Sequence, residues 1–238
     1  MQALFRLLDM DKNSKIVIDG IDVSTIGLRP LRTAMAVIPQ VPVLFSNSTV
    51  RENLDPFRAC DDATIRDALD DVQMVATIDD LPDGLNTVVS PSGSNFSVGE
   101  RQLLCLARAI VQRSSILVLD EATANVDTHT EVLLKRALQK RFADATIVMI
   151  AHRLDTIIDF DSILVLGNGR VLEYGSPQEL LAAAASNTTA TNDNSHDGQP
   201  NDGRGSDGAS DGAGTFASMV SHMGEEAAKR LKELAKKK

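Results

Sequence analysis

Unbroken apolar runs in this chain predict short, buried β-strands. Ile116–Leu119 (ILVL) has no polar alternation, which is typical of a strand covered on both faces of a parallel sheet. Comparable runs predict strands at Met35–Ile38, Thr146–Ile150, Ser162–Leu166 and Val171–Glu173. A helical pattern at Thr130–Phe142 lies between two of these strands, so the chain predicts an α/β fold with a parallel sheet core.

Helical spacing of apolar residues replaces the strand pattern between Met35–Ile38 and Ile116–Leu119. Helices are predicted at Thr49–Leu54, Ala63–Val72 and Ser97–Val111. These helices fall between two strands of the expected sheet, at about residues 43–112.

The N-terminal part predicts one helix and one strand. Met1–Asp9 has helical spacing of apolar residues, but no Ser, Thr, Asp or Asn precedes it as a cap. We therefore expect the chain to begin inside a helix. Lys15–Ile18, followed by the turn residues Asp19 and Gly20, predicts an edge strand.

The C-terminal part has a different composition. Residues 185–214 hold no aliphatic side chain larger than alanine, which predicts a disordered linker. Residues 215–238 have the periodicity of an amphipathic helix. That helix either docks on its own core or lies on a membrane surface through its basic end.

Composition excludes some classes of protein. The net charge of −9 argues against a nucleic-acid-binding protein, which would need a basic surface. No apolar stretch approaches the roughly 20 residues that a membrane span requires. Cys60 and Cys105 lack the spacing of a metal site, and Cys105, which lies among leucines, is expected to be a buried free thiol.

Two acidic residues, Asp120 and Glu121, directly follow the strand Ile116–Leu119. Ligands of parallel sheets bind at the carboxyl ends of the strands. Two carboxylates at a buried strand end are costly unless a cation or hydrogen bonds hold them. Mg²⁺ with a nucleotide phosphate would satisfy both, with Asp120 serving the metal and Glu121 positioning the attacking water. Strand-end acids are also common in proteins without such a site.

Three further segments carry a family resemblance. Phe96–Ala109 (FSVGERQLLCLARA) precedes the acidic pair, Ile150–Thr156 (IAHRLDT) follows it, and Met35–Phe57 contains a glutamine flanked by prolines. These segments resemble the signature loop, the switch histidine and the Q-loop of the nucleotide-binding domain of ATP-binding-cassette (ABC) transporters. The acidic pair then resembles its Walker B motif. The resemblance covers about residues 1–184 and is closest to the second nucleotide-binding domain of multidrug-resistance-associated (MRP, subfamily C) transporters.

The resemblance implies three catalytic residues, Glu121, His152 and Gln40, and assigns the metal to Asp120 and Gln40. Asp120 would hold Mg²⁺ through water, and Glu121 would be the catalytic base. Gln40 would sense both the metal and the phosphate, and His152 would contact the γ-phosphate. Gln40 and His152 each also have an interpretation without a ligand, as an ordinary loop residue and as a structural histidine.

The resemblance also implies a set of residues that face a nucleotide held by a second domain. They are Ser97, Val98, Gly99, Glu100 and Asp127. Most relatives carry Gln at position 100, so Glu100 would bring a negative charge towards a polyphosphate unless its carboxylate turns back onto its own helix. Without a ligand, Ser97 and Glu100 form a capping box and Asp127 caps the helix that follows it.

One motif of such domains does not occur in the chain. A phosphate-binding loop needs Gly-x-x-x-x-Gly-Lys-Ser/Thr, and the sequence contains no Gly-Lys dipeptide. The expected fold is therefore a phosphate-loop NTPase-type sheet core with an inserted helical subdomain, lacking the N-terminal strand and the Walker A loop. Either the sequence is a fragment that begins at an internal Met, or the protein is genuinely truncated.

The function implied by the resemblance is that of the ATP-hydrolysing motor of an MRP-type exporter, with ATP and Mg²⁺ as cofactors. Its partners would be a second nucleotide-binding domain and the transmembrane domains, at the cytosolic face of a membrane. The alternative is a non-catalytic partner that supplies its signature face to the ATP of another domain. A soluble ABC ATPase of DNA repair is disfavoured because the chain has no coiled-coil heptads.

Overall fold

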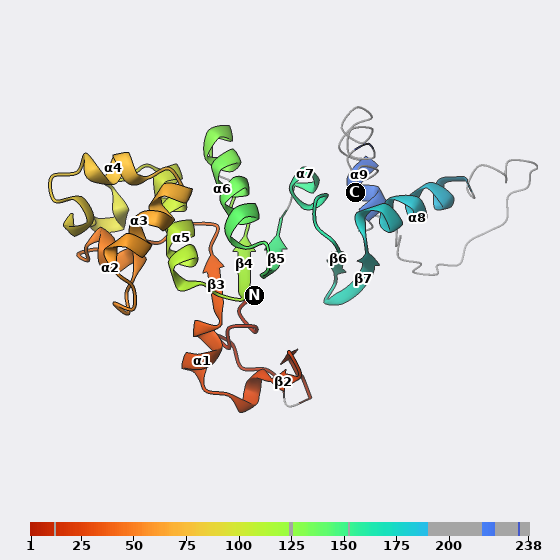
Figure 1. The fold of residues 1–238 in the computed structure, drawn as a ribbon. Helices are drawn as coiled ribbons and strands as arrows, with labels where there is room; N and C mark the ends of the chain where they lie inside the picture. The colour runs from red at the N-terminus through yellow and green to blue at the C-terminus, as the bar shows by residue number, and fades with distance from the viewer. Residues whose placement is uncertain (12, 124–125, 152, 190–215, 222–232, 234–238) are drawn as a thin grey trace, which may run out of the picture. The chain divides into compact units, whose positions relative to one another are not determined.

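The chain is divided into two units, Met1–Ile150 and Ala151–Lys238, each with its own buried core. The computed structural model describes residues 1–11, 13–123, 126–151, 153–189, 216–221 and 233. Figure 1 follows the elements along the chain.

A three-stranded parallel sheet forms the centre of the first unit. Its strands are β3 (Met35–Ile38), β4 (Ile116–Asp120) and β5 (Thr146–Ile150), in the order β3-β4-β5. Ile38 pairs with Leu119, which pairs with Met149, so the carboxyl ends of the three strands lie level. The central strand is fully buried at Leu117 and Leu119, as its unbroken apolar run predicts. The predicted fold class is confirmed.

Four helices form the insertion between β3 and β4. They are α2 (Val50–Leu54), α3 (Asp62–Asp71), α4 (Val75–Asp79) and α5 (Val98–Gln112). Thr49 and Glu52 make a capping box at α2, and Asp61 caps α3. The three predicted helices are confirmed. The short helix α4 was not predicted, because Met74 at its N-cap makes no side-chain hydrogen bond, so the sequence lacks the capping signal that marks α2.

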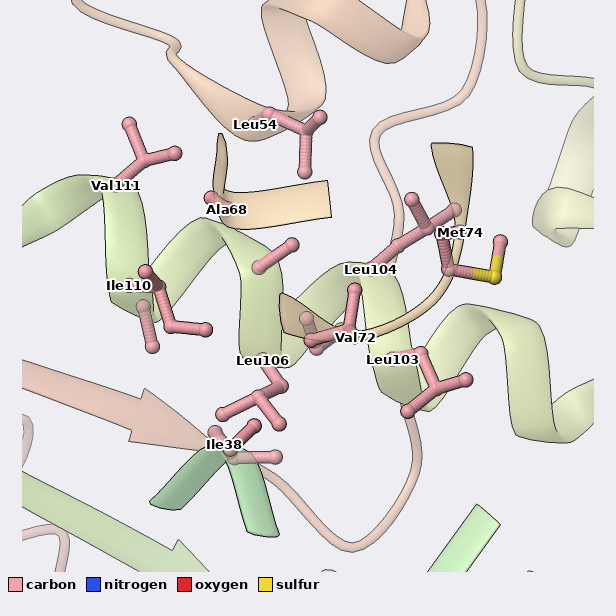
Figure 2. Close-up of a cluster of buried hydrophobic side chains, with 14 of the residues drawn as sticks. Ile38, Leu54, Ala68, Val72, Met74, Leu103, Leu104, Leu106, Ile110 and Val111 are labelled. Atoms are coloured by element: carbon pink, nitrogen blue, oxygen red, sulfur yellow. The ribbon is translucent and has the colours of Figure 1, made fainter. Parts of the chain in front are cut away.

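Helix α5 supplies much of the core of the first unit. Its buried residues include Leu103, Leu104, Leu106, Ile110 and Val111. Figure 2 shows these side chains among Leu54, Ala68, Val72 and Met74 of the insertion, with Ile38 of β3 beside Leu106. Burial of each large side chain contributes roughly 1.5–3 kcal/mol, so α5 fixes the helical insertion to the sheet.

Helix α6 (Thr128–Arg141) follows β4 and is joined to the insertion by ion pairs. The side chain of Asp71 in α3 is buried and contacts both Lys140, at 2.6 Å, and Arg141. Asp67 makes a second pair with Arg141 at 2.6 Å. These pairs hold the C-terminal end of α6 against α3.

The N-terminal residues correct one prediction. Met1–Asp9 forms hydrogen-bonded turns and contains no helix. Arg6 has a positive φ of 49°, which a right-handed helix does not accommodate, and its guanidinium donates to the carbonyl oxygens of Val23 and Ile26. The predicted helix is wrong because these long-range hydrogen bonds outweigh the local spacing of apolar residues.

A small hairpin and a short helix lead into the sheet. β1 (Val17–Ile18) pairs with β2 (Ile21–Asp22) through Asp19 and Gly20, which both have positive φ, as a tight two-residue hairpin requires. The predicted edge strand is thus present but shorter at its start. The 3₁₀ turn η1 (Val23–Thr25) and helix α1 (Leu28–Thr33) follow.

The second unit contains a separate hairpin and three helices within its described part. They are α7 (Leu154–Ile157), β6 (Ile163–Gly167), β7 (Arg170–Gly175), α8 (Pro177–Thr189) and α9 (Phe216–Ser221), with β6 and β7 antiparallel. Phe216 and Val220 of α9 are buried in a cluster with Leu180 and Leu181 of α8 and Ile163 of β6. The two predicted strands are confirmed, and the described start of the C-terminal helix packs on its own unit.

The boundary of the predicted linker needs correction. Helix α8 continues to Thr189, so residues 185–189 of the expected disordered segment are helical. The reason is the alanine run that precedes them, because alanine has the highest helix propensity. Residues 190–214 of the linker and most of 215–238 lie outside the described residues. None of the helices that the structure describes is long and apolar enough to span a membrane.

Candidate nucleotide site

Gln40 and Glu121 meet at the carboxyl ends of β3 and β4. Gln40 follows β3 after Pro39, and Glu121 follows the last residue of β4. The side-chain amide Nε2 of Gln40 donates a hydrogen bond to the Glu121 carboxylate Oε2 over 2.8 Å. This bond joins residues that lie 81 positions apart in the sequence. The parallel register of the strands is what brings them together.

The backbone at Glu121 has an unusual conformation. Its φ of 46° lies in the left-handed region, which is sparsely populated by residues with a side chain. The N–H group of Glu121 donates to the carbonyl oxygen of Ile150 on β5 over 2.9 Å, which holds the turn in place.

The half-buried carboxylate of Asp120 could take part in binding a metal ion. Asp120 is the last residue of β4 and pairs with Ile150. Among the described residues, no group of three or more His, Cys, Asp and Glu could hold a metal ion. Mg²⁺, however, keeps several waters and usually binds one or two carboxylates together with substrate phosphates. A single carboxylate beside the Gln40–Glu121 pair therefore fits a Mg²⁺ ion that binds together with a phosphate.

The start of α5 contains the predicted capping box. The Ser97 Oγ accepts from the Glu100 N–H over 3.2 Å, and the Glu100 Oε2 accepts from the Ser97 N–H over 2.7 Å. The carboxylate of Glu100 is thus turned back onto its own helix. Of the two positions expected for this carboxylate, the structure thus has the one in which it binds its own cap rather than extends towards a phosphate.

The start of α6 holds Asp127 by three hydrogen bonds. Its carboxylate accepts from the N–H groups of His129 and Thr130 over 3.0 and 3.1 Å, and from the Thr130 hydroxyl over 2.7 Å. The Thr130 hydroxyl is the largest cause that lowers the pKa of Asp127 below its usual value. The capping role predicted for Asp127 is confirmed.

Gly99 lies directly against this cap. A Cβ atom at position 99 would come within 2.8 Å of the Thr130 Oγ1 and 3.4 Å of the Asp127 Oδ2. The structure thus groups Gly99 with Asp127, as it groups Gln40 with Glu121. Thr130 was missed from the sequence, although the Asp-x-x-Thr spacing of a helix cap could have signalled it. His152 lies outside the described residues.

Arg108 of α5 was also missed, and it anchors the segment that follows Gln40. Its guanidinium donates to the carbonyl oxygens of Asn53 and Val43 over 2.6 and 3.1 Å, and to the Asn53 Oδ1 over 3.0 Å. It also lies over the ring of Phe45, 4.9 Å from the centroid. Burial lowers the pKa of Arg108. No local signal could reveal a contact between residues 55 positions apart.

We expect Arg108→Lys to lower the free energy of unfolding by about 2 kcal/mol. Lysine cannot reproduce three N–H contacts in one plane or the stack on Phe45, and a hydrogen bond from a charged group contributes about 1.5–3 kcal/mol. Urea unfolding followed by circular dichroism measures the effect. Arg136→Lys, at an exposed site of α6, is the matched control and should change the midpoint little. Equal midpoints for both variants would contradict an anchoring role for Arg108.

Comparisons with known proteins give consistent matches. The model of the ABC transporter family matches residues 1–124. ATP-binding cassette sub-family C member 4 of Homo sapiens is 51% identical over 181 residues, which is 76% of this chain and 13% of that protein. ATP-binding cassette sub-family C member 2 of Homo sapiens is 48% identical over 179 residues, covering 75% of this chain and 12% of that protein. The chain thus spans 12–13% of the length of these curated relatives.

A solved structure is similar as well. It is the structure of a bacterial Atm1-family ABC exporter with ATP bound, with a TM-score of 0.70 and 35% sequence identity. The alignment covers 82% of this chain and 35% of that chain.

Proposed function

The chain belongs to the ABC transporter family, as a nucleotide-binding domain of the MRP type, and we propose that residues 1–184 are part of the ATP-hydrolysing motor of an exporter. The observation that carries the proposal is the 2.8 Å hydrogen bond between Gln40 and Glu121 at the level carboxyl ends of β3 and β4. Parallel sheets bind their ligands at this edge. The carboxylate of Glu121 can accept a proton and so act as a general base. For this reason we propose that the chain corresponds to the second, hydrolysing domain of such a transporter.

In this proposal each residue at the sheet edge has one task. Glu121 accepts the proton of the attacking water, and Gln40 orients the Glu121 carboxylate through its amide. Asp120 would hold a Mg²⁺ ion through its waters, and that ion would neutralise phosphate charge when it is bound with ATP. His152, which follows β5 in the sequence, is proposed to contact the γ-phosphate. The phosphate cradle itself has no counterpart in this sequence, because it contains no Gly-Lys dipeptide.

The start of α5 is proposed to face the nucleotide of a second nucleotide-binding domain. Helix α5 is 15 residues long, and the N-terminus of such a helix favours an anion through its dipole and unpaired N–H groups. Ser97, Val98, Gly99 and Glu100 form this terminus. Asp127 lies beside Gly99 and is proposed to report to the same partner.

Because Glu100 is bound to its own cap, we expect Glu100→Gln to leave ATP-dependent dimerisation unchanged. Gln serves equally in a capping box, so the helix should lose only a few tenths of a kcal/mol. Dimer dissociation constants, measured with and without ATP in a protein extended upstream by a phosphate-binding loop, check this. A clear tightening by the Gln variant, absent without ATP, would show that the carboxylate reaches the phosphate after all.

Exposed apolar side chains after Gln40 support a transmembrane partner. Val41, Val43 and Phe45 of this segment are 68%, 55% and 49% exposed, and Phe57 is 72% exposed. Large exposed apolar patches are typical of interaction surfaces, and four exposed large apolar side chains within residues 41–57 would contribute to one. We propose that the transmembrane domains dock here and place the domain at the cytosolic face of a membrane.

A second candidate function is a non-catalytic partner that supplies its α5 terminus to the ATP of another domain. The observation behind it is the start of α5, whose N-terminus can favour an anion that another domain holds. Phosphate release distinguishes the two functions. Activity that appears when an upstream Gly-x-x-x-x-Gly-Lys-Ser segment is added identifies a motor. Activity that appears only when the unextended chain is mixed with a complete nucleotide-binding domain, whose own signature loop is disabled, identifies a partner.

A further inference from the structure

We infer that Thr130 is a positioning residue, which ties the Ser97–Glu100 loop to the Asp127 turn within a single chain. The two segments lie at the starts of α5 and α6. Only the role of these two segments in binding a nucleotide rests on the proposed function. Their physical linkage follows from contacts of Thr130 alone.

Thr130 fixes Asp127 from one side. Thr130 is only 5% exposed, and its hydroxyl donates to the Asp127 Oδ2 over 2.7 Å. Its N–H group donates to the other oxygen, Oδ1, over 3.1 Å. Both oxygens of Asp127 are therefore held by the same residue, which restricts rotation of the carboxylate.

Thr130 also fills the space that Gly99 leaves open. A Cβ at position 99 would lie 2.8 Å from the Thr130 Oγ1, closer than non-bonded atoms tolerate. Gly99 does not have a positive φ, so the backbone conformation does not demand glycine there. The close approach of the Thr130 hydroxyl, which is the atom that binds Asp127, therefore makes a side chain at this position unfavourable.

The Thr130 Oγ1 both binds Asp127 and occupies the space beside Gly99, so one atom couples the two segments. A shift of the loop at Gly99 moves the Thr130 hydroxyl, and the hydroxyl cannot move without altering its bond to Asp127. In the proposed motor, contact of the α5 terminus with a phosphate would thus be transmitted to Asp127 in the same chain. If Thr130 only helped to cap α6, its bond to Asp127 would not change when residue 99 is substituted or displaced.

The test uses the whole chain, labelled with ¹³C at aspartate carboxyl carbons. Thr130→Val removes the hydroxyl at nearly constant shape, and we expect the pKa of Asp127 to rise towards its usual value. Thr130→Ser retains the hydroxyl and should keep the pKa low. Glu100, His129 and Glu131, which are titratable and lie in the first turns of α5 and α6, are retained in every variant. An unchanged Asp127 titration in the Val variant would overturn the inference.

A double-mutant cycle tests the link to position 99. Gly99→Ala should lower the urea midpoint and shift the Asp127 carboxyl signal in the chain with Thr130. Both effects should be lost in the Thr130→Ala background, where the nearest remaining atom is the Asp127 oxygen at 3.4 Å. Gly27→Ala, whose Cβ would meet only ordinary contacts from 3.5 Å, is the control. If Gly99→Ala changed the urea midpoint and the Asp127 signal equally in both backgrounds, the inferred link through Thr130 would also be overturned.

No nucleotide is present in either measurement. A failure here therefore leaves the proposed ATPase function untouched, and a failure of phosphate release in the extended protein leaves the role of Thr130 untouched.

Discussion

Glu121→Gln should reduce ATP turnover by about a hundredfold or more, in a protein extended upstream by a phosphate-binding loop, while ATP binding is preserved. The Gln side chain has the size of Glu and still offers an oxygen to the Gln40 amide, which lies 2.8 Å from the present carboxylate. It cannot accept a proton from water. The geometry at the ends of β3 and β4 is thus kept while the base is removed.

Steady-state phosphate release and dimer size, measured on the same sample, check this result. We expect the variant to accumulate as an ATP-bound dimer because the nucleotide is bound but not hydrolysed. Glu131→Gln is the matched control, since Glu131 pairs with Lys135 on α6 and should be dispensable for turnover. Unchanged turnover in the Glu121 variant would leave Glu121 as an ordinary strand-end acid.

The chain without an upstream extension should bind ATP about a hundredfold more weakly than the extended protein. It has no Gly-Lys dipeptide, so the lysine and the backbone N–H groups that cradle the phosphates are missing. Hydrogen bonds to charged groups contribute about 1.5–3 kcal/mol each, and the loss of two of them already corresponds to more than a hundredfold in affinity.

Titration of each protein with a fluorescent ATP analogue in the presence of Mg²⁺ measures the difference. The extended protein with the loop lysine changed to Ala is the control for the extra chain length, and its affinity should fall between the other two. Micromolar affinity of the unextended monomer would show that its own residues suffice to hold the triphosphate.

The amino-acid sequence by itself determined the elements whose causes are local. The unbroken run ILVL gives β4, because a strand buried on both faces can carry no polar residue. The spacing of Ser97 and Glu100 gives the cap of α5, since both hydrogen bonds join residues within one turn. The acidic pair at the end of β4 also marks the candidate site locally. Two adjacent carboxylates directly after an apolar run can be read from the sequence, and burying them costs free energy unless a cation or hydrogen bonds hold them.

Only the tertiary structure decided which of these residues meet. The bond from Gln40 to Glu121 depends on strand order and register, and that from Arg108 to Asn53 on the packing of α5 against α2. The same holds for the turns at Met1–Asp9, where hydrogen bonds of Arg6 to distant carbonyl groups outweigh local periodicity. Contacts between residues far apart in sequence form only when the chain has closed large loops. Their energies depend on the whole fold, and no short window of sequence contains them.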